Sequence, residues 1–230
     1  NSYALTWNDN GKTATAADSG NLDKGQLTVT GLTWNTYRFI ETSTDPGYLP
    51  DDANGDKVSG EFTITRNTPN MAGGVTVSNA QTSLELNKQN EVGDALAGAK
   101  FTVTPVGNSA FADGSTAAKT MTSDSSGYAV LNGQLVVGGT YEIYEQTAPT
   151  GYDPVDAKFQ VYVQENGNLE VVGGDDALPD GWARADINHD GTIDDQFSFI
   201  ATNNHLAIQF AKVSSGNGGP LEGATFRLNG

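Results

Sequence analysis

The chain contains the stretch Thr140-Tyr141-Glu142-Ile143-Tyr144-Glu145-Gln146-Thr147-Ala148-Pro149-Thr150-Gly151-Tyr152 and an earlier, similar stretch, Thr36-Tyr37-Arg38-Phe39-Ile40-Glu41-Thr42-Ser43-Thr44-Asp45-Pro46-Gly47-Tyr48. Each opens as an alternating strand, reaches a glutamate five residues after its first threonine, and turns at a Pro and a Gly before a tyrosine. Side chains two residues apart share a strand face, so Glu145 lies with Tyr141 and Ile143. Glu41 has the same place in the other stretch. Because a carboxylate on a core face is costly unless paired or protonated, both glutamates are candidates for chemistry.

Charge and composition exclude several classes of function. The 230 residues carry 12 Lys and Arg against 28 Asp and Glu, a net charge of −16. Nucleic acids and anionic membrane surfaces need a basic footprint, so neither is an expected partner. The absence of cysteine excludes disulfides and thiol catalysis. No apolar run is long enough to span a bilayer, and no signal peptide opens the chain. The polar ends suggest a piece of a longer protein.

The composition predicts an all-β protein, because Gly, Thr, Asn and Val are abundant and helical periodicity is scarce. Residues 82–205 contain one full series of strands. The predicted strands are Leu84–Lys88, Leu96–Val103, Tyr128–Leu131, Tyr141–Glu145, Lys158–Val163 and Phe197–Asn203. Residues 1–81 repeat the series without its first strand, in Tyr3–Trp7, Gln26–Thr30, Tyr37–Glu41, Gly60–Thr65 and Val75–Asn79.

Residues 206–230 begin the series a third time. Ile208–Lys212 corresponds to Leu84–Lys88, and Leu221–Phe226 corresponds to the Leu96–Phe101 region. The spacing of nine residues from Asn79 to Lys88 recurs from Asn203 to Lys212. The period is therefore that of a small domain rather than of a short solenoid repeat.

Three polar residues of the full copy point at one predicted core. Lys88 shares a face with Leu84 and Leu86, Glu145 lies among apolar neighbours, and Asn203 ends an apolar strand. Taken singly, each has an ordinary interpretation as a solvated strand end or turn residue. Taken together, they come from the first, middle and last strands, which favours a shared chemical role. Asn204 is the alternative to Asn203, because a shift of one residue exchanges their faces.

The chemistry that suits this triple is acyl transfer. Burial disfavours the charged form of each group, so a buried lysine becomes a neutral nucleophile and a buried glutamic acid a proton donor and acceptor. The amine attacks the carboxamide, the acid moves protons, and ammonia leaves. The product is an amide cross-link between the first and last strands.

These motifs resemble those of Cna B-type domains, which build pilins and surface adhesins of Gram-positive bacteria. The resemblance lies in Leu84-x-Leu86-x-Lys88, in Leu96-Ala97-Gly98-Ala99-Lys100-Phe101, in Tyr141-x-x-x-Glu145-x-x-Ala148-Pro149-x-Gly151-Tyr152, and in Asn203. It implies tandem immunoglobulin-like β-sandwiches with Lys–Asn isopeptide bonds assisted by an acid. By resemblance, Lys88 is the amine, Asn203 the carboxamide and Glu145 the acid, and no cofactor is required.

The resemblance also implies one complete sandwich, residues 82–205, and one split sandwich. Residues 1–81 hold Glu41 and Asn79 but lack the strand that carries the lysine, whereas residues 206–230 supply that strand with Lys212. We therefore predict a Lys212–Asn79 bond with Glu41 as the acid. Since successive domains of this kind form a rod, the expected partner is residues 1–81 of another copy, joined head to tail; fold-back within one chain and an unreacted segment are the alternatives.

Residues 186–195 resemble an EF-hand or dockerin-type calcium loop. The oxygen donors are Asp186, Asn188, Asp190, Thr192, Asp194 and Asp195. Phe197 stands at position 12, where a bidentate acid is expected, and no flanking helices are evident. An acidic solvated loop is the alternative interpretation.

The resemblance thus implies a structural segment of an extracellular pilin or adhesin at a bacterial cell wall or pilus. A module that binds a host matrix protein or glycan, with or without calcium, is the alternative. An enzyme with turnover is disfavoured, because the two histidines belong to no recognisable triad and no phosphate-binding glycine loop is present.

Overall fold

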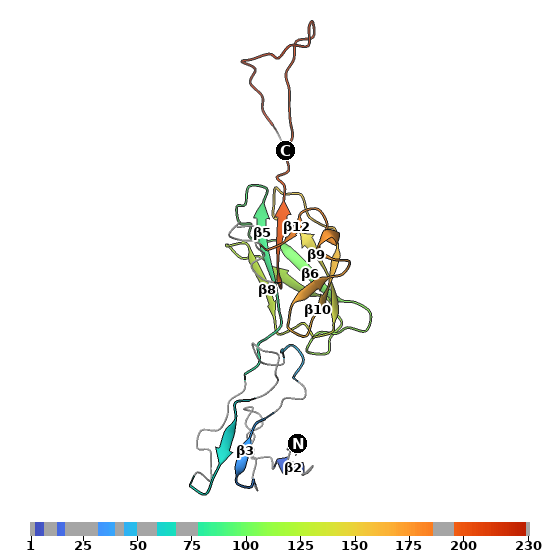
Figure 1. Ribbon diagram of the computed structural model, residues 1–230. Helices are drawn as coiled ribbons and strands as arrows, with labels where there is room; N and C mark the ends of the chain where they lie inside the picture. Colours follow the sequence, from blue (N-terminus) through green and yellow to red (C-terminus); the bar gives the residue numbers. More distant parts are fainter. Residues whose placement is uncertain are drawn as a thin grey trace.

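The computed structural model describes residues 3–6, 13–16, 32–39, 44–49, 59–67, 78–185 and 196–228. The described residues between 83 and 203 form two packed sheets (Figure 1). The predicted all-β class and sandwich fold are confirmed. The only helical element in the described ranges is a short 3-10 turn, η2 (Asp175–Ala177). These ranges contain no helix that is long and apolar enough to cross a bilayer.

The larger sheet has five strands in the order β11-β10-β9-β6-β7. Their bounds are β6 (Lys100–Pro105), β7 (Lys119–Thr122), β9 (Thr140–Thr147), β10 (Phe159–Val163) and β11 (Leu169–Val171). The smaller sheet has the order β12-β13-β5-β8. Its strands are β5 (Ser83–Asn90), β8 (Tyr128–Asn132), β12 (Trp182–Arg184) and β13 (Ser198–Asn203).

The core lies between these sheets and follows the alternation of the strands. Along β5, every second residue is buried from Leu84 to Asn90, and along β9 Tyr141, Ile143 and Glu145 are buried. Aromatic rings fill the centre, where Trp182 packs against Phe101 and Phe159. Because side chains alternate between the two faces of a strand, Lys88 and Glu145 point into the core at the ends of otherwise apolar strand faces.

The first and last strands of the sandwich are neighbours. β13 pairs with β5 in parallel, with Ala201 opposite Lys88 and Asn203 opposite Asn90, while β8 pairs antiparallel on the other side of β5. The chain enters at the start of β5 and leaves at the end of β13, at the opposite pole (Figure 1).

The two turns that end in Gly47-Tyr48 and Gly151-Tyr152 each bind the segment that leaves their unit, an arrangement we call the linker clasp. In the first clasp, Thr82 N–H donates to the Gly47 carbonyl at 3.0 Å, Leu49 N–H donates to Ala80, and Tyr48 bridges Gln81. In the second clasp, Leu206 N–H donates to Gly151 at 2.8 Å, Asp153 N–H donates to Asn204, and Tyr152 bridges His205. Two turns of similar sequence therefore make the same main-chain contacts.

The part before residue 78 is described in pieces. β1 (Tyr3–Thr6) pairs with β2 (Thr13–Ala16), and β3 (Asn35–Tyr37) pairs with β4 (Phe62–Ile64). Phe62 stacks with Phe39 at a ring-centroid distance of 5.5 Å. The predicted strand Gln26–Thr30 and residues 75–77 of the predicted last strand lie outside the described residues.

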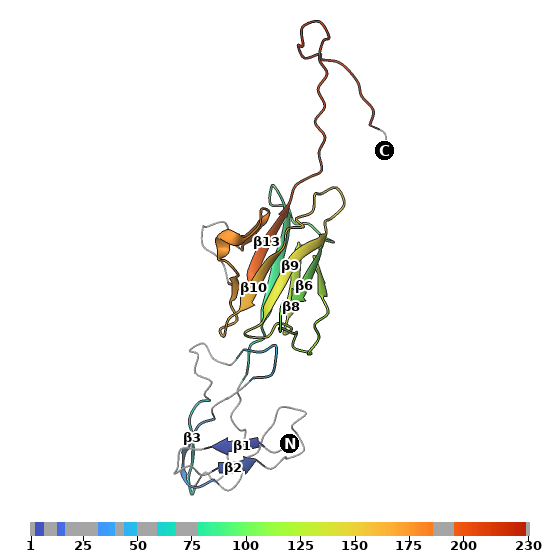
Figure 2. The same cartoon turned by 90° about the vertical axis from the view of Figure 1, so that its right-hand side faces the viewer.

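Residues 206–228 extend away from the sandwich and turn back on themselves (Figure 2). The predicted strands Ile208–Lys212 and Leu221–Phe226 do not form a ladder; a single bridge joins Val213 to Pro220. An isolated pair of strands is marginally stable and needs a third strand or a packed face. Ile208 is 81% exposed, although its counterpart Leu84 is completely buried.

Candidate isopeptide site

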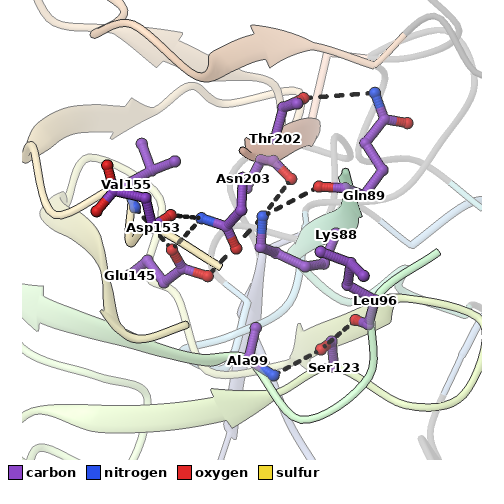
Figure 3. A network of polar contacts seen from close by, with 11 residues as sticks. Lys88, Gln89, Leu96, Ala99, Ser123, Glu145, Asp153, Val155, Thr202 and Asn203 are labelled. Carbon is purple, nitrogen blue, oxygen red and sulfur yellow. Dashed lines mark hydrogen bonds and ion pairs between the residues drawn. The ribbon is translucent and has the colours of Figure 1, made fainter. Parts of the chain in front are cut away.

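Three strands bring Lys88, Glu145 and Asn203 together inside the sandwich (Figure 3). Lys88 comes from β5, Glu145 from β9 in the opposite sheet, and Asn203 from the last position of β13. Their exposed fractions are 1%, 1% and 0%, so water is excluded from all three side chains. The neighbouring Asn204 is exposed, because the register of β13 turns Asn203 inward.

Glu145 joins the other two groups. Its Oε2 accepts hydrogen bonds from Asn203 Nδ2 at 2.7 Å and from the main-chain N–H of Val155 at 2.8 Å. Its Oε1 lies 3.8 Å from Lys88 Nζ. The lysine amine also donates to the Ala201 carbonyl at 2.8 Å, which holds it beside the last strand.

Two buried oxygens of the site, Glu145 Oε1 and Asn203 Oδ1, have no hydrogen-bond partner among the described residues. Both are acceptors, and a buried acceptor without a donor costs free energy. Figure 3 shows the Asn203 side-chain oxygen on the same side as Glu145 and Lys88.

Burial lowers the pKa of Lys88 from 10.5 to about 8, although the nearby Glu145 carboxylate opposes that change. Desolvation disfavours the ammonium form, so a substantial fraction of the amine is neutral near physiological pH. Only the neutral amine has a lone pair for attack on a carbonyl carbon.

Main-chain hydrogen bonds on both sides of Lys88 hold the backbone of this residue in position. Lys88 N–H donates to Gly127 at 2.7 Å, and the Lys88 carbonyl accepts from Leu96 at 2.9 Å. Gly127 has φ +78°, and a Cβ there would clash with the Lys88 carbonyl. The turn before β8 therefore needs glycine to approach the lysine backbone.

The other predicted site residues are placed differently. Lys212 is exposed, and Asn79 is partly buried next to the first linker clasp. Glu41 lies outside the described residues, as do all the predicted calcium ligands, Asp186, Asn188, Asp190, Thr192, Asp194 and Asp195. Among the residues that are described, no group of three acidic or histidine side chains is arranged to hold a metal ion.

The sequence did not reveal the contributions of Asp153, Val155 and Gly181. The first two act through a carbonyl and an N–H, which every residue except proline carries, so their side chains gave no signal. Gly181 lies beside Val155 through pairing of β12 with β13, and the three-residue strand β12 was not predicted.

Comparison with known proteins finds one family model, described as the SpaA prealbumin-like fold domain, which matches residues 82–177. None of the curated proteins compared with the chain matches it significantly.

Solved structures with similarity include a C-terminal fragment of the pilus adhesin SpaC from Lactobacillus rhamnosus GG, at 20% identity over 90% of this chain and 88% of that chain, with a TM-score of 0.43. The open conformation of SpaC is 20% identical, and the alignment covers 90% of this chain and 29% of SpaC, with a TM-score of 0.44. BcpA, the major pilin subunit of Bacillus cereus, is 20% identical over 54% of this chain and 29% of that chain, with a TM-score of 0.32. Residues 82–177 thus match the SpaA prealbumin-like fold family, and the resemblance to Cna B-type domains is confirmed over this part of the chain.

Proposed function

We propose that residues 82–205 form a self-cross-linking domain in which Lys88 and Asn203 become joined by an amide bond with Glu145 as the acid–base group. The observation that carries this proposal is the burial of an amine, a carboxyl and a carboxamide in one apolar core, with Glu145 in contact with both reactants. A core of this kind without chemistry would bear the cost of three desolvated polar groups.

The proposed reaction conserves every atom. The neutral Lys88 Nζ attacks Cγ of Asn203, the Nζ–Cγ bond forms, and the Cγ–Nδ2 bond breaks. Glu145 takes one proton from Nζ and returns one to Nδ2, so ammonia leaves and the carboxyl group ends as it began. The reaction occurs once per molecule and needs no cofactor.

Intact-mass measurement tests the cross-link. The purified chain is expected to weigh one ammonia less than its calculated mass, and a peptide containing Lys88 joined to Asn203 is expected after digestion. Glu145→Ala should restore the calculated mass, because proton transfer is lost. A full calculated mass for the folded unaltered chain would refute the proposal.

We infer that the cross-linked domain serves as load-bearing material in a pilin or adhesin at the bacterial cell surface. Support comes from the SpaA family match and from the parallel pairing of the first and last strands, through which tension between the two poles would pass. Surface display would be tested by antibody labelling of intact cells that produce the whole protein. A signal confined to lysed cells would contradict this assignment.

A second proposal concerns residues 206–228, in which the apolar side chains Ile208 and Phe210 are exposed at 81% and 66%. The corresponding side chains of β5, Leu84 and Leu86, are fully buried in the core, and β5 itself is paired with β8 and β13 on either side. We propose that residues 1–81 of a second copy cover this segment by strand addition, with Lys212, Glu41 and Asn79 as the reacting groups.

A denaturing gel of concentrated protein tests this contact between copies. A ladder that Lys212→Ala abolishes would support it, and Lys100→Ala, at another exposed lysine, is the control. Monomer with two ammonias lost would show fold-back within one chain. Monomer with one ammonia lost would show that the segment does not react. Both results would overturn the proposed contact.

A further inference from the structure

The loop after β9 binds both Glu145 and Asn203 through main-chain groups. Val155 N–H donates to Glu145 Oε2 at 2.8 Å, and the Asp153 carbonyl accepts from Asn203 Nδ2 at 2.8 Å. Asn203 Nδ2 also donates to the same Glu145 oxygen at 2.7 Å. The peptide from Asp153 to Val155 thus closes a ring of hydrogen bonds with the carboxyl and the carboxamide (Figure 3).

This ring fixes how the carboxamide is turned. Both hydrogens of Asn203 Nδ2 are taken by acceptors, Glu145 Oε2 and the Asp153 carbonyl. A flipped amide would set its oxygen against these two acceptors, so the ring holds the leaving nitrogen towards the loop. It also occupies Glu145 Oε2, which leaves Oε1 as the carboxyl oxygen facing Lys88.

The loop packs closely against Gly181. A Cβ built at Gly181 would lie 2.8 and 3.0 Å from the two methyl carbons of Val155 and 3.1 Å from the Thr202 carbonyl. Gly181 is itself fixed to the last strand, because its carbonyl accepts from Thr202 N–H at 2.8 Å. Only a residue without a side chain therefore lets Val155 settle this close to β13.

A hollow of about 190 Å³ lies between the loop and the residues that it faces. Asp153, Val155, Asp180, Gly181, Thr202 and Asn204 are among its lining residues. The loop is therefore not packed against these residues along its whole length, and we expect that a side chain at position 181 would shift it without unfolding the sandwich.

We propose that Val155 and Gly181 are positioning residues for the cross-link between Lys88 and Asn203. Because Gly181 has no side chain, Val155 can pack close to the last strand. This position allows the Val155 N–H to bind Glu145 and the Asp153 carbonyl to bind Asn203. This inference rests on the cross-linking function proposed above.

Gly181→Ala tests the role, with Gly174→Ala as a matched control. The two glycines have φ +87° and +86°, but a Cβ at Gly174 meets nothing within 4 Å. An alanine is thus disfavoured by a positive φ at both positions, and only position 181 adds a side-chain clash. Cross-linking would be timed by cell-free synthesis, quenching in denaturant and intact-mass measurement of the ammonia lost. We expect Gly181→Ala to be slower than Gly174→Ala by about 10- to 100-fold, since small misplacements of reacting groups have effects of this size.

A double variant separates positioning from general damage. Val155→Ala removes the methyl groups that Gly181→Ala would strike, so the pair Val155→Ala/Gly181→Ala should recover much of the lost rate. Strain at position 181 alone would not be relieved by this second change. Cooperative unfolding of each variant would establish that it is folded.

Should Gly181→Ala fail to fold, Val155→Pro provides the second route, because it deletes the N–H that binds Glu145. Ala157→Pro, further along the same loop, is its control. Equal rates for Gly181→Ala and Gly174→Ala, no recovery in the double variant, or equal rates for the two proline variants would overturn the positioning role. If the unaltered chain loses no ammonia, the proposed cross-link itself is wrong.

Discussion

Lys88 lies opposite Ala201 in the parallel pair of β5 and β13, and its amine donates to the Ala201 carbonyl at 2.8 Å. Asn203 is two residues further along the same face of β13. The amine is therefore held against the strand that carries its proposed target before any bond forms. A bond between Lys88 and Asn203 would close a loop of more than a hundred residues.

Loss of the cross-link is expected to lower the free energy of unfolding. Lys88→Met keeps the length of the side chain but removes the nucleophile. Closing a loop of this length contributes about 4–5 kcal/mol in the chain-entropy treatment. Guanidinium denaturation should reveal a loss of that size, with Lys100→Met, at an exposed position, as the control. A change below about 1 kcal/mol, within the usual range for single substitutions, would argue against a covalent tie in the unaltered chain.

Asn203→Asp is expected to prevent the reaction. The carboxylate would face Glu145 Oε2 and the Asp153 carbonyl, two acceptors that now bind the amide hydrogens. Repulsion between acceptors would turn the group away from Lys88. Intact mass should show no loss of ammonia or water, while Asn204→Asp, at the exposed neighbour, should react as before. Efficient reaction of Asn203→Asp would show that the loop does not select for a carboxamide.

Stability of a form that cannot react should rise between about pH 8 and pH 10.5. Asn203→Ala leaves Lys88 buried with its pKa lowered to about 8, whereas the unfolded chain has the ordinary value of 10.5. Across this window the unfolded state binds more protons, so the free energy of unfolding increases with pH, by roughly 2–4 kcal/mol in total. Well below pH 8 the lysine is charged in both states, and the free energy of unfolding no longer changes with pH through this group.

Urea denaturation across the window measures this contribution. Lys88→Met/Asn203→Ala is the reference, because it keeps every other titrating group. The free energy of unfolding of Asn203→Ala should rise with pH relative to that of the reference variant. A constant difference would show that the amine of Lys88 is not desolvated.

Tyr141→Phe should destabilise the sandwich without affecting the reaction. The Tyr141 hydroxyl donates to the Ala110 carbonyl at 2.7 Å and accepts from Val136 N–H at 2.9 Å, near the opposite end of β9 from Glu145. Removing it leaves both partners unpaired, which costs about 1–3 kcal/mol. Thermal unfolding and intact mass should separate the two effects. Tyr162→Phe, at a partly exposed tyrosine, is the control.

Calcium binding by residues 186–195 stays a prediction of the sequence. Calorimetric titration of chelator-treated protein should show heat at millimolar calcium or below, and Asp186→Ala/Asp190→Ala should remove it. Absence of heat from the unaltered chain would favour the acidic-loop interpretation.

Most of the sandwich could be predicted from the sequence, because long strands such as β5 and β9 display their period of two over eight residues. The short strands β7, β11 and β12 could not, since three or four residues display too little of a period. For the same reason the core position of Trp182 was missed.

The side chains of the candidate site could be named because a lysine and a glutamate on apolar strand faces are conspicuous. The choice between Asn203 and Asn204 could not be made from alternation, because it depends on the register of β13 against β5. The main-chain contacts of Asp153 and Val155 depend on how a loop folds over the core. No residue type marks such contacts, and only the assembled structure reveals them.

The two linker clasps act through main-chain hydrogen bonds. Gly47 receives the N–H of Thr82, and Gly151 receives that of Leu206, although these two linker residues are chemically unlike. In the first clasp the Thr82 hydroxyl adds a second hydrogen bond to the Gly47 carbonyl, at 3.2 Å, but the main-chain bonds that both clasps share do not require a particular linker side chain. An array of such units could vary the residues at its joints, and with them its antigenic surface, while each outgoing segment keeps the same course past its clasp.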